Sequence, residues 1–457
     1  MKAFGKITAI MLAAVMATVI FTAAGCGGAT VGVRGDNAKD DVLTVGIAGD
    51  SGESVIIETL RRPFEKMYKE KTGKTITVSS TRINGEYING IQTRKNANNL
   101  PNIVQVYDYA AEFLTYREVL EPISGFMERD GVSDTDFVPS VVSFMKSGGT
   151  NDDKVYWAAR DYNRVVVMYN KDIFDAAGVS YPQNGWTWDE FTAACKNLSD
   201  ASETIKAATN RSVFYPVDAN LNFEAVYYPA IRSFGGDIYD TAAGSAFKNE
   251  QGVKRGLTEL YNLVDKGYSV APGQSGTAFS VKEAAMYFCV RPNIVSAATH
   301  LRKPDGTSPI DFVTMPTFTD NEKSYVGMGC TGYGITVSCP ENKRELAWEF
   351  LKFVMSEEGQ TLLSSSGSGF PMRKDMLNEE AAFNDFLPEA DHSAFYTDPS
   401  GSKNVDVAMN FLKGFRVQKH NAIYSVIKDN LMTSLCNQNN SDSYYNTLKS
   451  RFNGAIA

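Results

Sequence analysis

Apolar and polar residues alternate along the chain in blocks that predict strands and helices in turn. Residues 165–169 form a bounded apolar run rich in β-branched side chains, which is typical of a strand covered on both faces. Asn170 is suited to cap the short helix predicted over Lys171–Ala177, and Gly178 stands where a left-handed stop is expected. Thr187 and Glu190 then form a capping box, which predicts the start of a further helix.

The same alternation continues on both sides of this stretch. Strands are predicted at residues 43–48, 75–78, 103–107 and 284–288, and an extended, glycine-punctuated segment at 326–338. Apolar residues show helical spacing from Ile57 to Tyr68, where Pro63 is expected to kink or restart the helix, and again from Ala347 to Met355. Strands that alternate with helices predict parallel sheets built from βαβ units.

The first 41 residues have the pattern of a targeting segment followed by a linker. Lys2 and Lys6 precede an apolar run at residues 7–20, which is too short to span a membrane, and small residues follow up to Cys26. This pattern resembles a bacterial lipoprotein signal over residues 1–25, in which Cys26 takes the lipid, although Ala23 stands where that motif prefers leucine. A plain secretory signal is the alternative. The glycine-rich residues 26–41 predict a flexible tether that reaches about 20 Å.

Length and charge narrow the class of protein. A chain of 457 residues is too long for one core, so two lobes are expected. Hydrophobic residues at 43% and charged residues at 21% are ordinary for a soluble globular protein. Removing Lys2 and Lys6 with the signal leaves 43 basic against 53 acidic residues, a net charge of −10. This acidic balance argues against nucleic acid as a partner and against electrostatic binding to membranes, so a lipid would be the one anchor.

Residue types that carry catalysis or bind metals show no matching pattern. The spacing of the cysteines other than Cys26 does not match a zinc site; these are Cys195, Cys289, Cys330, Cys339 and Cys436. Cys330 and Cys339 are close enough in the sequence to form a disulfide, but buried free thiols are the alternative, and no disulfide is assigned. The three histidines are isolated, Gly73-Lys74-Thr75 lacks the first glycine of a phosphate loop, and no G-x-S-x-G or H-E-x-x-H motif occurs. We expect no enzyme activity, no metal and no cofactor.

Five blocks of residues together resemble the extracellular solute-binding lipoproteins that deliver sugars to ATP-binding-cassette transporters. The central block is Asp161-Tyr162 with residues 165–172 and Thr187-Trp188-Asp189-Glu190-Phe191. The others are Gly235-Gly236-Asp237 with Asp240, Ala284-Ala285-Met286, residues 347–351, and Glu358-Gly359-Gln360. The resemblance covers nearly the whole chain after the signal.

This resemblance implies an α/β fold with two lobes that close on a ligand like a clamp, as in periplasmic binding proteins. The chain would cross between the lobes near residues 158–162, 329–334 and 367–371. Residues 42–159 plus 331–366 would form lobe 1, and residues 160–330 plus 367–457 lobe 2. The function implied is that of a monomeric carbohydrate receptor, anchored by its lipid to the outer face of the bacterial cell membrane, that passes its sugar to the permease of an importer.

Ligands of open α/β sheets bind beyond the carboxyl ends of the strands, so the candidate binding residues follow the predicted strands. A sugar needs carboxylates and amides for its hydroxyls and an aromatic face for its ring. The candidates are Asp50, Glu53, Thr81, Arg82, Asp108, Tyr109, Arg160, Asp161, Tyr162, Asn163, Arg291, Asn293 and Tyr333.

Several candidates have a structural alternative. Asp108 is placed by the resemblance as a ligand-facing acid, but it could instead cap a helix. Arg160 could pair with an acid, and Asp161 and Tyr162 could serve the crossing alone. Tyr333 falls where the resembling family often carries a stacking tryptophan, so we expect a stacking ring there.

One departure from the family pattern affects the expected ligand. Residues 289–293 read Cys-Val-Arg-Pro-Asn where the family commonly shows Asp-Gly-Ser-Trp-Asn, so Pro292 replaces the stacking tryptophan and Arg291 stands beside it. If Arg291 faced the cleft, it would suit a carboxylate, which leaves room for an acidic sugar. Two other functions remain open, a sensor subunit for a signalling kinase and an extracellular carbohydrate-active enzyme.

Overall fold

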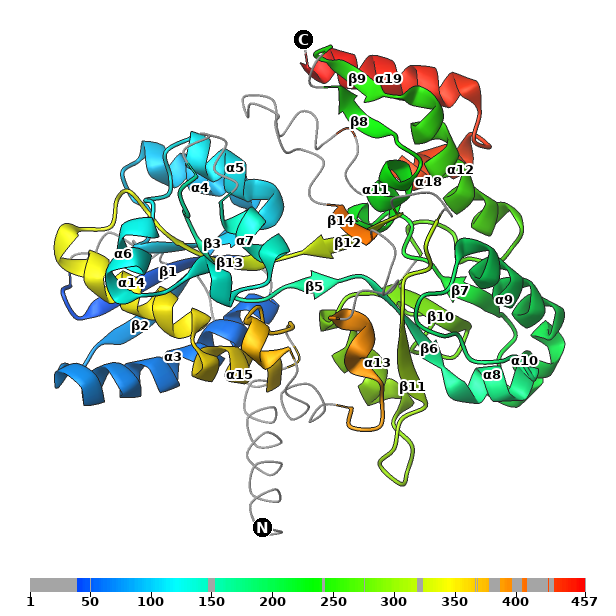
Figure 1. Cartoon of the computed structure of the whole chain (residues 1–457), viewed down its shortest axis with the longest axis horizontal. Coiled ribbons are helices and arrows are strands. Elements are labelled where there is room, and N and C mark those ends of the chain that lie inside the picture. Colours follow the sequence, from blue (N-terminus) through cyan, green and yellow to red (C-terminus); the bar gives the residue numbers. More distant parts are fainter. Residues whose placement is uncertain are drawn as a thin grey trace, which may run out of the picture.

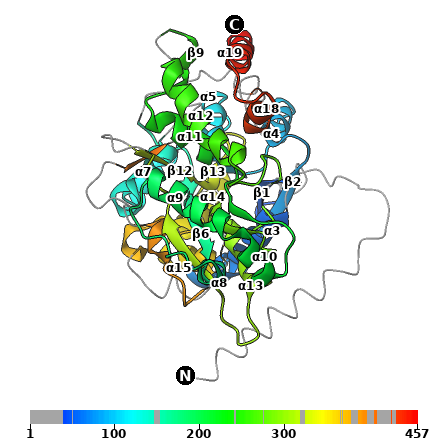
Figure 2. The same cartoon turned by 90° about the vertical axis from the view of Figure 1, so that its right-hand side faces the viewer.

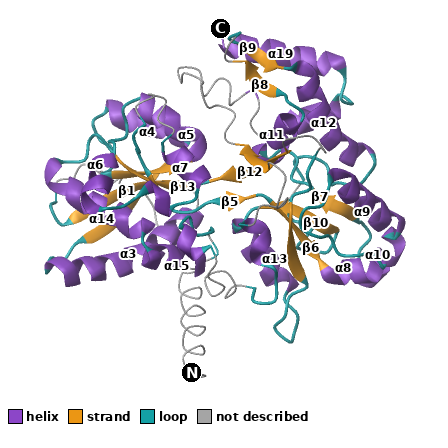
Figure 3. Ribbon diagram, viewed as in Figure 1, coloured by secondary structure: helices purple, strands orange, loops and turns teal. Residues whose placement is uncertain are grey.

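The computed structural model shows two α/β lobes side by side, with strands running between them (Figure 1 and Figure 3), which confirms the predicted fold class. The structure describes residues 39–456 apart from 50, 147–152, 241–242, 275, 319–323, 366, 368, 378–386, 397–404, 409–425 and 427–430. The targeting segment, Cys26, most of the tether, Asp50 and His420 therefore lie outside the described residues.

The first lobe is built on a five-stranded sheet in the order β2-β1-β3-β13-β4. Its strands are β1 (Val42–Ala48), β2 (Thr77–Ile83), β3 (Ile103–Tyr107), β4 (Ala158–Ala159) and β13 (Thr331–Ile335). β2 and β3 pair in parallel with β1, whereas β13 runs antiparallel to β3 and β4. The carboxyl ends of β1 and β3 therefore lie at the same edge, which faces the second lobe (Figure 1).

Helices cover both faces of this sheet. They are α3 (Ser51–Thr72), α4 (Tyr87–Asn96), α5 (Asp108–Tyr116), α6 (Ser124–Asp130), α7 (Pro139–Met145), α14 (Glu341–Met355) and α15 (Glu357–Ser365). α3 continues through Pro63, so the expected restart of the helix there is wrong. Phe64 of α3 meets Phe350 of α14 edge to face, with ring centroids 5.1 Å apart. A core formed by residues from α3, α14 and the strands thus fixes the end of β3 and the start of α5.

The second lobe is built on a four-stranded sheet in the order β11-β6-β10-β7. Its strands are β6 (Val166–Asn170), β7 (Tyr215–Asp218), β10 (Ala284–Cys289) and β11 (Ile310–Thr314). β6 is buried along its whole length, as its apolar run predicts. β10 pairs in parallel with β7 and antiparallel with β6.

The helices of the second lobe lie on both sides of this sheet and extend to a small hairpin at one end (Figure 2). They are α8 (Lys171–Ala177), α9 (Trp188–Asp200), α10 (Ser202–Thr209), α11 (Glu224–Ser233), α12 (Glu250–Asp265), α13 (Pro292–Leu301), α18 (Leu431–Asn437) and α19 (Asp442–Ile456). The hairpin consists of β8 (Asp237–Asp240) and β9 (Ser245–Lys248). Elsewhere in the chain, short 3₁₀ turns lie at Asp134–Asp136, Lys374–Met376 and His392–Phe395. Both capping predictions are confirmed, since Gly178 is left-handed and Thr187 and Glu190 form the capping box.

A three-stranded sheet joins the lobes. It contains β5 (Asn163–Arg164), β12 (Ser324–Gly329) and β14 (Val405–Ala408) in the order β14-β12-β5. A further crossing passes near Phe370, which pairs with Tyr162 in an isolated bridge. The five cysteines among the described residues are all free thiols. Within the same part of the chain, no helix combines the length and the apolar character needed to cross a membrane.

Candidate functional site

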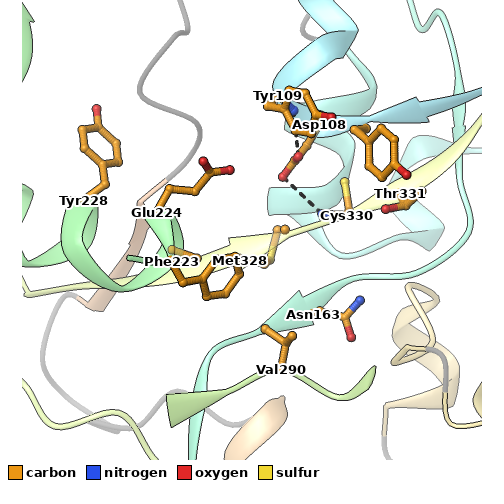
Figure 4. Close-up of a pocket in the computed structure, with 13 residues that line it drawn as sticks. Asp108, Tyr109, Asn163, Phe223, Glu224, Tyr228, Val290, Met328, Cys330 and Thr331 are labelled. Atoms are coloured by element: carbon orange, nitrogen blue, oxygen red, sulfur yellow. Dashed lines mark hydrogen bonds between the residues drawn. The ribbon is translucent and has the colours of Figure 1, made fainter. Parts of the chain in front are cut away.

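A cavity of about 210 Å³ lies between the lobes, beside the connecting strands (Figure 4). We refer to it as the α5–α11 cavity, because its two walls come from the starts of those helices. Its lining consists of Tyr107, Asp108, Tyr109, Asn163, Phe223, Glu224, Ala225, Tyr228, Val290, Met328, Gly329, Cys330 and Thr331. Lobe 1, lobe 2 and the connecting strands all contribute, so the shape of the cavity depends on how the lobes are placed.

Asp108 is the charged residue that lobe 1 contributes to this wall. It follows directly after β3 and is the first residue of α5. The residue at the N-cap position of that helix is Tyr107, so the alternative in which Asp108 is the N-cap is wrong. Its carboxylate accepts backbone N–H bonds from Tyr109 (2.7 Å) and from Cys330 (3.3 Å) (Figure 4). Burial raises the pKa of Asp108 to about 7, an effect that the two N–H donors oppose and the negative charge of Asp161 reinforces.

Aromatic rings lie on both sides of the cavity. Tyr107 and Tyr109 stack on each other, with centroids 5.3 Å apart and planes inclined by 17°. Burial raises the pKa of Tyr109, so its hydroxyl stays protonated at neutral pH. Phe223 and Tyr228 lie across the cavity from Tyr109, on the wall of lobe 2 (Figure 4). Such rings offer flat apolar faces for a ligand together with hydroxyl groups that hydrogen-bond.

Glu224 supplies a second carboxylate from the opposite lobe. It is the first residue of α11, and Figure 4 shows its side chain across the cavity from Asp108. The close approach of α11 to β12 fixes this position, because a Cβ on Gly327 would lie 1.8 Å from the carbonyl oxygen of Ala225. On the same helix the hydroxyl of Tyr228 donates to the carboxylate of Asp237 over 3.1 Å.

A second cavity, of about 400 Å³, lies between α3 and α13. Tyr107 lines both cavities, so they adjoin at this residue. The lining of this α3–α13 cavity is Gly52, Glu53, Val55, Ile56, Thr59, Gln105, Tyr107, Arg160, Pro292, Val295 and Gly367. Together the two cavities fall within the roughly 300–1,000 Å³ of small-molecule sites. The α3–α13 cavity is the larger, but its buried polar side chains are bonded to one another.

Glu53 is the centre of that bonded group. Its carboxylate accepts from the Tyr333 hydroxyl (2.5 Å) and from the Gln105 amide (2.9 Å), and it pairs with Arg160 (2.9 Å). Arg160 also forms an ion pair with Asp161 over 3.1 Å. Burial raises the pKa of Asp161 to about 6, although the charge of Arg160 opposes this. This network ties α3, β3, β13 and the first crossing together inside lobe 1.

The structure thus separates the predicted site residues into two groups. Asp108 and Tyr109 line the α5–α11 cavity, and Asn163 joins them from β5. Glu53 and Arg160 touch the α3–α13 cavity through a network that is almost completely buried. Asp161 is 1% exposed and takes a backbone bond from Thr331, so its position serves the crossing.

The other predicted residues that the structure describes do not line either cavity; they are Thr81, Arg82, Tyr162, Arg291, Asn293 and Tyr333. Tyr333 is completely buried and bonded to Glu53, so the expectation of a stacking ring there is corrected. Tyr162 is buried and its hydroxyl donates to the carbonyl of Phe395. Asn293 accepts the backbone N–H of Val290 at the start of α13, and Arg82 is exposed and contacts Ser54.

Arg291 is directed away from the α5–α11 cavity. Its side chain is 1% exposed, its guanidinium lies over the ring of Phe370 at 4.3 Å, and Nη2 donates to the carbonyl of Ser364. Burial without an acidic partner lowers the pKa of Arg291 to about 10. The expectation that Arg291 would offer its charge to an acidic sugar is therefore corrected, because an apolar ring and a helix end hold the guanidinium.

Sequence reasoning missed the wall that lobe 2 provides. Phe223, Glu224 and Tyr228 lie after β7, a strand of four residues whose pattern is too short to predict. Pro229 inside α11 further conceals the helix that carries them. The signal that could have found them is the acid directly before an apolar run at residues 225–231. Among the described residues, no group of histidine, cysteine and acidic side chains is arranged to hold a metal ion.

Comparison with a family model gives a match over residues 64–387, to the bacterial extracellular solute-binding proteins. Proteins described as binding proteins from Brucella abortus (strain 2308) and Brucella suis biovar 1 (strain 1330) are 23% identical over 291 residues. The match covers 61% of this chain and 62% of each relative, so the chain spans less than two thirds of their length.

Solved structures with the same fold cover nearly all of the described chain. The substrate-binding protein from Listeria monocytogenes in complex with cycloalternan is 19% identical, with a TM-score of 0.67 over 91% of this chain and 98% of that one. A solute-binding protein from Thermotoga lettingae bound to α-D-tagatose is 17% identical, with a TM-score of 0.67 over 91% and 100%. UgpB from Mycobacterium tuberculosis, in complex with glycerophosphocholine, is 15% identical, with a TM-score of 0.67 over 90% and 99%.

Proposed function

Because the chain belongs to the bacterial extracellular solute-binding protein family, we propose that it is a receptor that captures a carbohydrate between its two lobes. The observation that carries the proposal is the α5–α11 cavity, which is lined by one carboxylate from each lobe, Asp108 and Glu224 (Figure 4), and by the stacked tyrosines Tyr107 and Tyr109. Carboxylates accept bonds from sugar hydroxyls, and flat rings pack against the apolar face of a sugar. Solved proteins of this fold hold cycloalternan or tagatose, which supports the same class of ligand.

We propose further that the loaded receptor delivers its sugar to the permease of an ATP-binding-cassette importer. Binding changes the spacing of two lobes joined by a few strands, and a membrane partner can recognise the closed form. The receptor acts outside the cytoplasm as a monomer and performs no chemistry on its ligand. Incubating candidate glycans with the protein tests the last point, since any released product would contradict a receptor without enzymatic activity.

A thermal-shift screen over sugars tests the carbohydrate proposal directly. A ligand at 100 times its Kd adds about 2.7 kcal/mol to the free energy of unfolding, which raises Tm. We expect at least one mono- or oligosaccharide to raise Tm in the wild type and to lose this effect in Glu224→Gln. A screen in which amino acids, peptides or polyols raise Tm and no carbohydrate does would contradict the proposal.

We also propose that Cys26 carries a lipid that anchors the receptor to the outer face of the cell membrane. The run of small residues before Cys26 and the glycine-rich residues 26–41 support this. Metabolic labelling with a palmitate analogue should mark the wild type and not Cys26→Ser. Equal labelling of both proteins would contradict the anchor, while leaving the carbohydrate proposal in place.

A further inference from the structure

The charged side chains that line the α5–α11 cavity are both acidic. Asp108 from lobe 1 and Glu224 from lobe 2 both line it, and the described lining residues include no lysine, arginine or histidine. The chain as a whole adds to this field, because acidic residues outnumber basic ones. A ligand that enters therefore meets an acidic side chain from each wall.

Asp108, which is half-buried, differs from the two fully buried acids near the crossings. Glu53 and Asp161 both pair with Arg160, at 2.9 and 3.1 Å. Asp108 forms no ion pair with any described lysine or arginine; its oxygens accept backbone N–H groups only. Burial raises the pKa of Asp108 to about 7; the two backbone N–H groups oppose this rise, and the negative charge of Asp161 adds to it. A positive group in the cavity would supply an opposite charge to this carboxylate.

Neither of the two arginines nearest the cleft lines the α5–α11 cavity. Arg160 is enclosed by Glu53 and Asp161 within lobe 1. Arg291 stacks on Phe370 and donates to Ser364. Neither arginine therefore offers a partner to an anionic ligand in this cavity.

The aromatic side chains favour the same sign of charge. The faces of tyrosine and phenylalanine rings attract cations, and sites that combine several rings with carboxylates suit ammonium groups. Here Tyr107 and Tyr109 stack on each other in the wall of lobe 1, and Phe223 lies across the cavity from Tyr109 (Figure 4). Tyr228 also lines the wall of lobe 2, and its ring already lies 6.0 Å from the guanidinium of Arg232. Resting on the proposed carbohydrate function, we propose that the ligand is a carbohydrate bearing a positively charged amino group, held between Asp108 and Glu224.

A panel of matched sugars tests this assignment. The panel contains glucose, glucosamine, N-acetylglucosamine and glucuronic acid, each as the monosaccharide and as the 1,4-linked disaccharide. Each of the last three differs from glucose at a single carbon, which is C2 for the two amino sugars and C6 for the acid, while the ring is kept. We expect calorimetric titration at pH 7 to give at least tenfold tighter binding for the amine than for the hydroxyl, acetamide or carboxylate form. Raising the salt concentration should weaken the binding of the amine form more than that of the other forms, because the extra affinity of the amine is electrostatic.

Variants connect the preference to the named acids. Asp108→Asn and, separately, Glu224→Gln should each remove most of the advantage of the amine form while leaving weak binding of the neutral sugar. Glu203→Gln, which removes the same charge from a side chain of α10 that is 90% exposed, is the matched control and should keep the preference. Two variants on different lobes keep the test meaningful if one of them folds poorly.

The possible results separate the two levels of the proposal. Equal affinity for amine and hydroxyl forms, or tighter binding of the carboxylate form, would overturn the charge assignment and leave the carbohydrate receptor standing. An amine preference that survives in both Asp108→Asn and Glu224→Gln would also overturn it. Failure of every sugar in the panel and in the wider thermal-shift screen would overturn the receptor proposal and the charge assignment together.

Discussion

The acidic residues near the crossings have two different roles. The hydrogen-bond and ion-pair partners of each acid indicate which role it has. Glu53 is 3% exposed and is bonded to an arginine, a tyrosine and a glutamine at once. Asp108 has backbone partners and faces the cavity. An acid with a full set of internal partners stabilises the fold, whereas one that lacks a counter-charge is available to a ligand.

Glu53→Gln should lower the free energy of unfolding by about 3 kcal/mol, because it leaves the buried Arg160 with one acidic partner in place of two. The change keeps the size of the side chain, so the loss reports on charge. Glu58→Gln on the same helix is the control; it removes an exposed pair with Arg61 and should cost within about 0.5 kcal/mol. Urea denaturation of the three proteins measures this, and similar midpoints would contradict the assigned role.

Asp108 should make stability depend on pH between about 4 and 7. Its pKa is about 7 in the folded protein, against roughly 3.9 for an unfolded aspartate, so within that window the folded state keeps a proton that the unfolded state has released. Stability from this group is therefore lost as pH rises. The titratable or charged groups around it are Tyr109, Cys330, Asp161 and Glu224.

Asp108→Asn should flatten that dependence. We expect it to be more stable than the wild type at pH 8 by about 1 kcal/mol, since solvent at the half-buried carboxylate reduces the full effect of the shift. Thermal melts at pH 5, 6, 7 and 8 give the two curves, with Glu203→Gln as the charge control. Parallel curves for Asp108→Asn and the wild type would show that Asp108 is not the group responsible.

The position of a residue at the end of a strand could be predicted from the sequence only where the strand itself could be predicted. The boundaries of β3 follow from its apolar run, and Asp108 and Tyr109 after it were correctly placed at the cleft, although their binding role stays a prediction. Arg291 also follows a predicted strand, but a strand end does not determine the direction of a long side chain. Phe370, 79 positions later in the chain, provides the ring that turns Arg291 inward, and no local pattern reveals such a contact.

At the scale of elements, the cleft depends on how closely α11 packs on β12. Gly327 of β12 lies under the first turn of α11, and any larger residue there would overlap the carbonyl of Ala225. This contact sets the position of Glu224, the next residue back along the helix. The sequence predicts an extended segment at 326–338 but gives no sign of the helix that packs on it, since that contact joins residues about 100 positions apart.

Gly327→Ala should lower stability by about 1–3 kcal/mol and weaken ligand binding, because α11 must move away from β12. Gly125→Ala is the control: Gly125 is exposed within α6 with open space around it, so alanine there should raise stability by about 0.5–1 kcal/mol. Denaturant titration and calorimetry with the identified sugar measure both effects. If Gly327→Ala bound the sugar with unchanged affinity, the position of α11 would not control the binding site.

At the scale of the molecule, the two lobes are joined more tightly at one crossing than at the others. β5 pairs with β12 through two residues only, Asn163 and Arg164. The crossing at Phe370 is packed, because this ring stacks on Phe395 with centroids 4.4 Å apart and carries the guanidinium of Arg291. The exact lobe boundaries at residues 159/160, 330/331 and 366/367 stay predictions.

Ligand binding should therefore make the molecule more compact. The walls of the α5–α11 cavity belong to different lobes, so a ligand that contacts both Asp108 and Glu224 favours the state in which they lie closest. Small-angle scattering with and without a sugar that raises Tm measures the radius of gyration, which should fall on binding. A sugar of equal size that leaves Tm unchanged is the control and should leave the radius unchanged as well. If the radius stays constant at saturating ligand, the site is preformed, and closure is not the signal that a permease would recognise.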